Sequence, residues 1–387
     1  MKYSILSLTL LINTALSPAL LAQNKAVCDI SWTIAAQIPP ASGQIISHGL
    51  AGAAIGTIDH QLVIAGGTNF PDKMPWNGGG KNYYNDIFIY TKTVQDLVLK
   101  VNKSPLKLPI NLAYGAVCST KNGIVIAGGE NEKGLSNIVW LLSWKAGGLT
   151  IHQLPNLPQA TTNASVAVNG NMLYLAGGEI KNGTTSQFLS LDLDAPKQGW
   201  KVLPNLPHAT SHAILLGLEQ NKNAELYLIS GRKRNLGHTS TLYNTMYAFD
   251  VKQQVWTTNK ALPFPLSAAT GIVKGKSFLV FSGDKGETFH QAEQLIAEID
   301  REKDITKKEI LNQQKIKVQA NHPGFSKTVL KYDLDTDVWT ELPQAMPYGT
   351  VTTTAVLLNN EVIIAGGEIK AGVRTPNIMV GKLKTTK

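Results

Sequence analysis

Leu62-Val63-Ile64-Ala65-Gly66-Gly67 is the stretch that decides the fold, because near copies of it recur along the chain. A short apolar run that ends in a small residue and glycine returns at 124–129, 173–178, 226–231, 278–283 and 362–367. Apolar runs of this length are typical of buried strands. Glycine lets the backbone turn sharply where a Cβ atom would clash. The pattern therefore predicts six buried strands, each followed by a tight turn.

The spacing of these glycines indicates which β-structure the strands build. Most intervals are near 50 residues, and one, between Gly283 and Gly367, is 84. A double glycine with a period of roughly 50 is typical of the kelch repeat, in which each copy is one four-stranded propeller blade. An aromatic residue and a tryptophan follow several copies, as at Tyr247 and Trp256, and these rings would pack between blades. We expect an all-β, six-bladed kelch-type β-propeller that forms one domain over residues 23–387.

The ends of the chain predict how the ring closes. The last repeat runs through 378–380 and stops without its tryptophan strand, whereas an unassigned strand with Trp32 precedes the first repeat. We expect the N-terminal strand to complete the last blade, because this pairing removes two open sheet edges at once.

The long interval contains an insertion in the fifth repeat, over residues 287–322. Residues 291–299 are helix formers with a partial apolar stripe, and 301–317 are heavily charged. We expect a charged, helical insertion. It is either a solvated decoration or a lid over the propeller mouth, since it follows a repeat glycine directly.

Composition and the N-terminus bear on location and partners. The 387 residues include 36 Lys+Arg, 27 Asp+Glu and only two cysteines, Cys28 and Cys118. These counts exclude a dense disulfide scaffold and a cysteine-ligated metal cluster. No basic arm for nucleic acid is present. The positive charge favours an anionic ligand.

The first 22 residues have the pattern of a signal peptide. Lys2 precedes an apolar stretch over 5–21, and Ala22 offers a small residue before the cleavage point. We expect export to the periplasm and no membrane span after cleavage; an N-terminal anchor is the alternative. An oxidising compartment would permit a Cys28–Cys118 disulfide, and free thiols are the other possibility.

The residues that directly follow each repeat glycine are candidates for chemistry, because propellers bind ligands on loops at the end of the central channel. Three of them are glutamates, Glu130, Glu179 and Glu368, and the others are Thr68, Arg232 and Asp284. A carboxylate here can also be a plain turn residue. Glu368 is distinguished by Arg374 six residues later, which adds a bidentate carboxylate partner to a potential base. A loop over 69–84, rich in glycine, amides and aromatic residues, suits a sugar or a mere surface loop.

Two motifs resemble the N-acetylneuraminate epimerase (sialic acid mutarotase) family of kelch-type propellers. They are Gly80-Lys81-Asn82-Tyr83 and the loop from Glu368 to Thr375, which matches the family's Gly-Glu-x-Lys-x-Gly-x-Arg-Thr pattern at Glu, Lys, Gly, Arg and Thr. The first motif precedes the second here, whereas the typical epimerase has the opposite order. The chain thus resembles the cyclically permuted branch of the family.

The resemblance implies an isomerase that interconverts the α and β anomers of a small anionic sugar, N-acetylneuraminate. It implies Glu368 as the base and Arg374 as the clamp on the sugar carboxylate. Lys81, Asn82, Tyr83 and Arg232 are weaker candidates for substrate contacts. Ring opening by acid–base chemistry needs no metal and no cofactor. A homodimer is compatible with the sequence.

Other classes of protein remain open at this point. One is a kelch module that binds carbohydrate or protein without catalysis, since fold alone does not give function. Another is a sialidase, because 282–289 fits the Asp-box pattern; four arginines in the whole chain disfavour it. A kelch-type copper oxidase needs a Cys–Tyr site, which Cys118 does not resemble.

Overall fold

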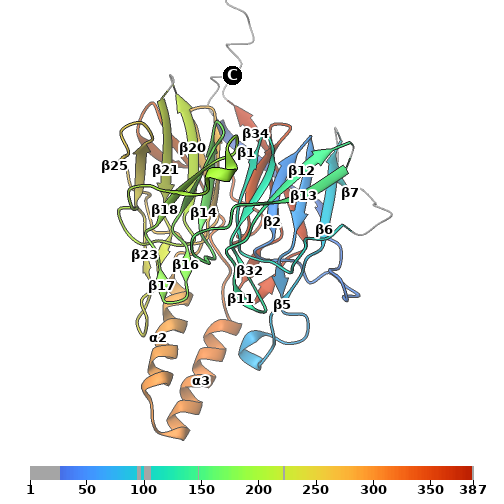
Figure 1. The fold of residues 1–387 in the computed structure, drawn as a ribbon. Helices are drawn as coiled ribbons and strands as arrows, with labels where there is room; N and C mark the ends of the chain where they lie inside the picture. Colours follow the sequence, from blue (N-terminus) through green and yellow to red (C-terminus); the bar gives the residue numbers. More distant parts are fainter. Residues whose placement is uncertain (1–26, 94–96, 100–105, 147, 221–222, 386–387) are drawn as a thin grey trace, which may run out of the picture.

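Six four-stranded antiparallel sheets are arranged around a central axis in the computed structural model, which describes residues 27–93, 97–99, 106–146, 148–220 and 223–385 (Figure 1). The expected six-bladed propeller is therefore confirmed. The expected signal peptide lies outside the described residues, as does the side chain of Cys28.

Each blade has the same strand order, from the central channel outward. Blade 1 is β2 (Ala54–Ile58), β3 (Gln61–Ala65), β6 (Ile87–Lys92) and β7 (Leu97–Leu99); blade 2 is β8 (Ala116–Thr120), β9 (Gly123–Ala127), β12 (Val139–Lys145) and β13 (Gly148–Leu154); blade 3 is β14 (Ser165–Asn169), β15 (Met172–Ala176), β18 (Phe188–Asp192) and β19 (Lys201–Val202). Blade 4 is β20 (Ile214–Gln220), β21 (Asn223–Ile229), β24 (Met246–Asp250) and β25 (Val255–Asn259); blade 5 is β26 (Thr270–Lys274), β27 (Ser277–Phe281), β28 (Val329–Asp333) and β29 (Val338–Glu341); blade 6 is β30 (Ala355–Leu358), β31 (Glu361–Ala365), β34 (Asn377–Thr385) and β1 (Val27–Gln37).

The sixth blade joins the two ends of the chain. β1 is its outer strand and pairs antiparallel with β34, from Val27 opposite Thr385 to Gln37 opposite Asn377. Trp32 stands opposite Gly381 and meets the Phe281 ring edge-on, with ring centroids 5.8 Å apart. The predicted closure is confirmed, because the first strand covers the sheet edge that β34 would otherwise expose.

A ring of six residues holds the inner ends of the blades together around the axis. Each lies two or three residues before an inner strand and has a left-handed φ between 53° and 62°; they are Gly52, Tyr114, Asn163, His212, Ala268 and Thr352. Their backbones form hydrogen bonds from blade to blade, as from Tyr114 N–H to the Gly52 carbonyl at 2.7 Å and from His212 N–H to the Asn163 carbonyl at 3.0 Å. These bonds tie blade 6 to blade 1 and each of blades 1 to 4 to the blade that follows it.

The recurring glycines occur where backbones approach closely. Gly66 and Gly67 have φ values of 66° and 101°, and a Cβ atom on Gly66 would lie 2.3 Å from the Leu112 carbonyl oxygen of the next blade. Only glycine satisfies both constraints. Aromatic residues fill the space between blades as expected: Phe188 of blade 3 lies 5.2 Å from Trp256 of blade 4.

After its second strand, each blade extends to the same face of the propeller (Figure 1). Five blades do so with a two-stranded hairpin: β4 (Thr68–Asn69) with β5 (Asn82–Tyr83), β10 (Glu130–Asn131) with β11 (Gly134–Leu135), β16 (Glu179–Ile180) with β17 (Gly183–Thr184), β22 (Arg232–Lys233) with β23 (Thr241–Leu242), and β32 (Glu368–Lys370) with β33 (Val373–Arg374). Two 3₁₀ turns, η2 (Pro75–Asn77) and η3 (Pro196–Gln198), lie in connecting loops.

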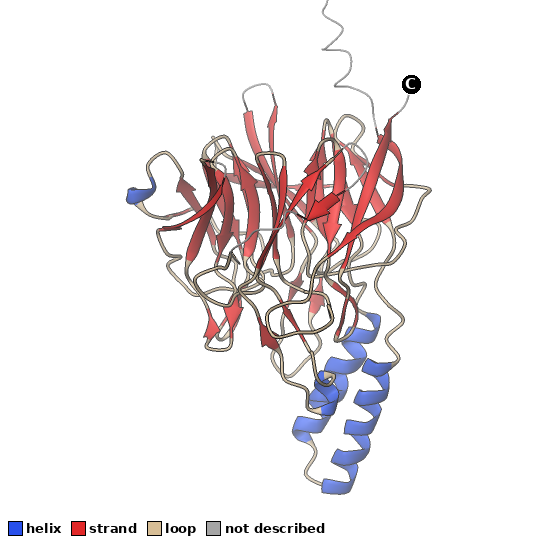
Figure 2. Ribbon diagram, turned by 90° about the vertical axis from the view of Figure 1, so that its right-hand side faces the viewer, coloured by secondary structure: helices blue, strands red, loops and turns tan. Residues whose placement is uncertain are grey.

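Blade 5 carries a helical hairpin at this position, formed by α2 (Glu287–Arg301) and α3 (Ile305–Ala320), which projects from the face (Figure 2). The expected helix over 291–299 is thus longer, and the charged segment after it is a second helix. α3 has no apolar stripe that would reveal it, and the Asp304 carboxylate caps it by accepting from Lys307 N–H at 2.9 Å.

Removal of residues 27–37 should abolish cooperative unfolding, because blade 6 would lose its outer strand and expose the edge of β34. A chain that starts at residue 27 is the matched control and should melt in one sharp transition. Thermal unfolding by circular dichroism measures both. An unchanged transition after the deletion would contradict the closure.

Candidate functional site

The face that carries the hairpins is the mouth of the propeller, and most of the residues predicted to act on a ligand lie on its hairpins. Glu130, Glu179, Arg232, Asp284 and Glu368 each form a bridge back to the residue before the ring position of their own blade. Their side chains therefore surround the axis at the same level.

Glu368 and Arg374 face each other on the short hairpin of blade 6. They are opposite in the register of β32 and β33, and Arg374 Nη2 lies 3.2 Å from Glu368 Oε2. The other carboxylate oxygen accepts from Gly372 N–H at 2.8 Å. The hairpin thus fixes both residues, as their spacing predicted.

Arg374 is almost completely buried, with 4% of its side chain exposed. Its guanidinium lies 4.5 Å from the centroid of the Phe70 ring, which belongs to the long loop of blade 1. Among the described residues, Nε and Nη1 of Arg374 have no hydrogen-bond partner. Burial of unpaired donors costs about 1–3 kcal/mol each, and more for a charged group. The arrangement therefore favours an anionic oxygen donor to complete the site.

Lys81 and Tyr83 of the Gly-Lys-Asn-Tyr motif bind the glutamate of the next blade. Lys81 Nζ lies 3.0 Å from Glu130 Oε1, and the Tyr83 hydroxyl donates to the same oxygen at 2.7 Å. Burial and the hydrogen bond to Glu130 raise the pKa of Tyr83 to about 12. Asn82 is exposed on β5 and is not brought to the other candidates.

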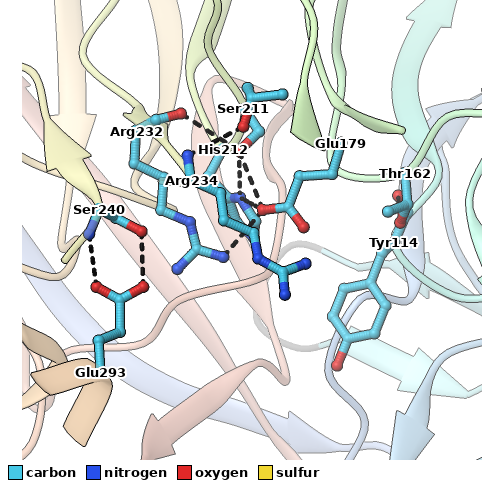
Figure 3. Close-up of polar contacts among 10 residues, drawn as sticks. Tyr114, Thr162, Glu179, Ser211, His212, Arg232, Arg234, Ser240 and Glu293 are labelled. Carbon is cyan, nitrogen blue, oxygen red and sulfur yellow. Dashed lines mark hydrogen bonds and ion pairs between the residues drawn. The ribbon is translucent and has the colours of Figure 1, made fainter. Parts of the chain in front are cut away.

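Glu179 of blade 3 is held by groups from blade 4, as Figure 3 shows. Glu179 Oε1 lies 3.1 Å from Arg232 Nη2 and accepts from the Ser211 hydroxyl at 3.2 Å. Burial alone would raise the pKa of Glu179, but the charge of Arg232 and the hydrogen bonds from Arg232 and Ser211 lower it below its usual value. Arg232, predicted as a substrate contact, thus pairs with Glu179 and lies apart from the Glu368 hairpin.

His212 lies beneath this pair on the channel ring. Burial, assisted by the charge of Arg232, lowers its pKa to about 3, against a smaller opposing effect of Glu179. The imidazole is therefore neutral at physiological pH, and its Nδ1 lies 3.1 Å from the Ser211 hydroxyl oxygen.

The base of the helical hairpin belongs to the mouth. The Phe289 ring of α2 lies 4.6 Å from the Arg232 guanidinium, and Glu293 accepts from Ser240 N–H and from the Ser240 hydroxyl, both at 2.7 Å (Figure 3). The distal parts of α2 and α3 extend away from the propeller (Figure 2). The insertion is therefore anchored beside the candidate site.

The Asp-box-like stretch does not form the outer hairpin that this motif needs. Asp284 bridges Ser267 at the mouth, and α2 begins three residues later.

Cys118 is a free thiol on β8 beside the central channel, where burial raises its pKa to about 12. The channel itself encloses about 430 Å³ and is lined by the six inner strands.

The sequence identifies the loop over 69–84 as a candidate but does not single out Phe70 in it, and it does not point to Tyr114, His212 or Phe289 as site residues. Phe70 and Phe289 each cover an arginine, while Tyr114 and His212 occupy ring positions that precede an inner strand. The ring positions could have been found from their constant place, 15 residues before the second glycine in most repeats.

No described helix is long and apolar enough to cross a membrane.

The fold and site define a class: a six-bladed propeller whose mouth holds half-buried glutamate–cation pairs and a buried arginine with unpaired donors. A family model described as N-acetylneuraminate epimerase matches residues 8–151 and 154–387. The chain belongs to this family.

Curated relatives named N-acetylneuraminate epimerase are similar over part of their length. The protein from Brucella melitensis biotype 1 is 32% identical over 125 residues, which are 31% of this chain and 32% of the relative. The protein from Vibrio vulnificus is 33% identical over 121 residues, 29% of this chain and 30% of the relative. The match thus spans about a third of the length of these curated relatives.

His212→Asn should make the protein less sensitive to acid. The unfolded histidine binds a proton below about pH 6.5, whereas His212 in the folded protein stays neutral to about pH 3. The unfolded state therefore binds more protons between these values, and the free energy of unfolding falls as the pH is lowered. Asparagine tolerates the left-handed φ, as Asn163 does at the same position of blade 3.

Urea unfolding at several pH values between 4 and 7 measures this slope. His60→Asn is the matched control, because His60 also has a left-handed φ but is exposed on a turn. The slope should become shallower in His212→Asn and stay as in the wild type in His60→Asn. Equal slopes in all three proteins would show that His212 does not resist protonation.

Proposed function

We propose that this protein interconverts the α and β anomers of N-acetylneuraminate. The observation that carries the proposal is Arg374, which is buried beside Glu368 with two donor nitrogens unpaired among the described residues. A sugar carboxylate could accept from the unpaired Nη1 in a charge-assisted hydrogen bond. The family membership and the names of the relatives support this substrate.

The reaction is the opening of the sugar ring at the anomeric carbon, rotation about the adjacent bond and closure on the opposite face. Glu368 would take the proton of the anomeric hydroxyl. Its carboxylate is fixed by Gly372 N–H and by Arg374, so the base does not need to reorganise when the proton moves. General base catalysis of this kind contributes on the order of 10²–10⁴ in rate.

The remaining candidates would orient the substrate. Lys81 and Tyr83 are held by Glu130 on one side of the mouth, and Arg232 is held by Glu179 on another. Asn82 is exposed and can reach a ligand only from the rim. The net charge of +9 would attract an anionic sugar to the mouth.

Access to Arg374 requires a movement. Phe70 lies over the guanidinium, and the unpaired nitrogens are not reached by solvent. Binding would therefore displace the Phe70 side chain, so that the aromatic ring moves from the arginine to the edge of the sugar. The N-terminal sequence further supports a periplasmic location for this activity.

A binding module without catalysis is the second candidate. One observation favours a binding module: each of the three glutamates at the mouth is paired with a cation, and a paired carboxylate is a weaker base. The three are Glu130, Glu179 and Glu368. Catalysis and binding differ in their response to removal of the Glu368 charge, and this comparison separates the two.

Glu368→Gln should lower the rate of anomer interconversion on the order of 10²–10⁴-fold with little change in affinity. Glutamine keeps the shape and can still accept from Gly372 N–H. Arg374→Lys should act differently, because it keeps the charge but loses the planar fork. Loss of one hydrogen bond to a charged group, about 1.5–3 kcal/mol, corresponds to a rise in KM of roughly ten- to hundredfold.

Proton NMR of freshly dissolved N-acetylneuraminate with catalytic amounts of protein measures both parameters. Glu341→Gln is the matched control, because Glu341 is an exposed carboxylate on the outer strand of blade 5. A wild-type rate in Glu368→Gln would assign that residue to the turn and move the search for the base to Glu179 or Glu130.

Replacement of residues 287–320 by a short Gly-Ser linker should leave the propeller folded, since loop length affects stability only weakly. It should lower activity, because Arg232 loses the cover of Phe289 and the mouth admits more water. Removal of residues 296–312 alone keeps Phe289 and Glu293 and is the control. Full activity of the complete replacement would make the insertion a decoration.

A further inference from the structure

The ring-opening reaction needs an acid for the ring oxygen as well as a base, and Tyr114 has an unusual place near the centre of the mouth. It occupies the ring position of blade 2, with a φ of 57°. A bulky residue in this conformation costs on the order of 1–3 kcal/mol. Gly52 at the same position of blade 1 meets the geometry without strain. The ring of six residues around the channel therefore does not require a tyrosine at this position.

Gly52 and Lys81 lie against the aromatic ring of Tyr114. The ring packs on Gly52, where an added Cβ atom would lie 2.5 Å from Tyr114 Cδ1. Lys81 Nζ lies 5.1 Å from the ring centroid. The hydroxyl and the guanidinium groups of Arg232 and Arg234 extend in the same direction from the backbone (Figure 3). The phenol therefore lies beside the Lys81–Glu130 pair.

The charges around Tyr114 act on both protonation states. Burial raises the pKa of the Tyr114 hydroxyl, and Glu368 adds to this, whereas Lys81, Arg374 and a hydrogen bond with Arg374 partly oppose it. The phenol is thus protonated at neutral pH and can donate. The two cations are in place to stabilise the negative charge that would remain after donation.

Three other titratable side chains described at the mouth, Tyr83, Lys81 and His212, are less suited to donate a proton. The Tyr83 hydroxyl is committed to Glu130. The pKa of Lys81 is raised, since the interactions with Tyr114 and Glu130 outweigh its burial. His212 is neutral, and its Nδ1 is occupied with Ser211.

We propose that Tyr114 is the acid that protonates the ring oxygen of the sugar when the ring opens; this rests on the proposed function. Glu368 takes the proton of the anomeric hydroxyl. The electron pair of the broken O–H bond then forms the second bond of the carbonyl at the anomeric carbon. The bond from the anomeric carbon to the ring oxygen breaks, and its electron pair stays on the ring oxygen, which takes the proton of Tyr114. Closure on the opposite face returns each proton along the same path, so no co-reactant is consumed.

Tyr114→Phe removes only the hydroxyl and tests this role. The kcat for anomer interconversion should fall about 10²-fold or more, while KM changes less than about threefold. Tyr174→Phe is the matched control, because Tyr174 packs on Phe188 in the core of blade 3 and should leave both parameters unchanged. Circular dichroism and thermal melting check that both variants fold.

A second variant gives a readout that a purely structural role would not move. Replacement of Tyr114 by 3,5-difluorotyrosine keeps the ring and hydroxyl but lowers the phenol pKa, so the alkaline limb of the kcat profile should shift to lower pH. A kcat for Tyr114→Phe within twofold of the wild type, or an alkaline limb that does not move, would overturn the proposal. Failure of the wild type to accelerate interconversion would instead refute the proposed function, and this inference with it.

Discussion

The ring of blade-to-blade hydrogen bonds around the channel is the constraint on which the rest of the structure depends. All six ring residues take a left-handed conformation, and in five of them the N–H reaches the ring carbonyl of the preceding blade, as Asn163 reaches Tyr114 at 3.0 Å. The turn that follows sends the chain up the inner strand and back to the repeat glycines. The pairing of β1 with β34 secures the same ring from outside. Geometry at the axis therefore fixes where the mouth residues stand.

Because every blade repeats this geometry, the residue after each glycine arrives at the same level of the mouth. The chain uses the position in blades 2, 3 and 6 for a glutamate, and each glutamate is paired with a cation: Lys81, Arg232 or Arg374. Removal of one partner would leave the other charge half-buried and uncompensated, which is costly. The mouth is thus preorganised. Among the described residues, Arg374 keeps two buried donor nitrogens without a partner at 4% side-chain exposure, whereas Arg232 keeps one, Nε, at 19%. This difference singles out blade 6 as the anion site.

Much of this could be predicted from the sequence because a repeat multiplies a weak signal. The recurring glycines predicted six blades. The unassigned strand with Trp32, which precedes the first repeat, predicted the closure of the ring. Glu368 and Arg374 were found because the two residues lie on one short hairpin. Contacts between blades could not be read in this way. The pairing of Arg232 with Glu179 joins residues 53 apart, and the cover of Arg374 by Phe70 joins the first blade to the last. A helical insertion was expected over 287–322, but its division into two helices was not, because α3 buries none of its residues and so leaves no apolar stripe in the sequence.

The central claim is that the mouth of this propeller catalyses exchange between two anomers of a bound sugar acid. Two-dimensional exchange NMR on N-acetylneuraminate at anomeric equilibrium tests it without any change of the protein. The account predicts cross-peaks between the H3 protons of the α and β forms when catalytic amounts of protein are added, and none in buffer at the same pH. Absence of these cross-peaks, even with protein and sugar in equal amounts, would contradict it.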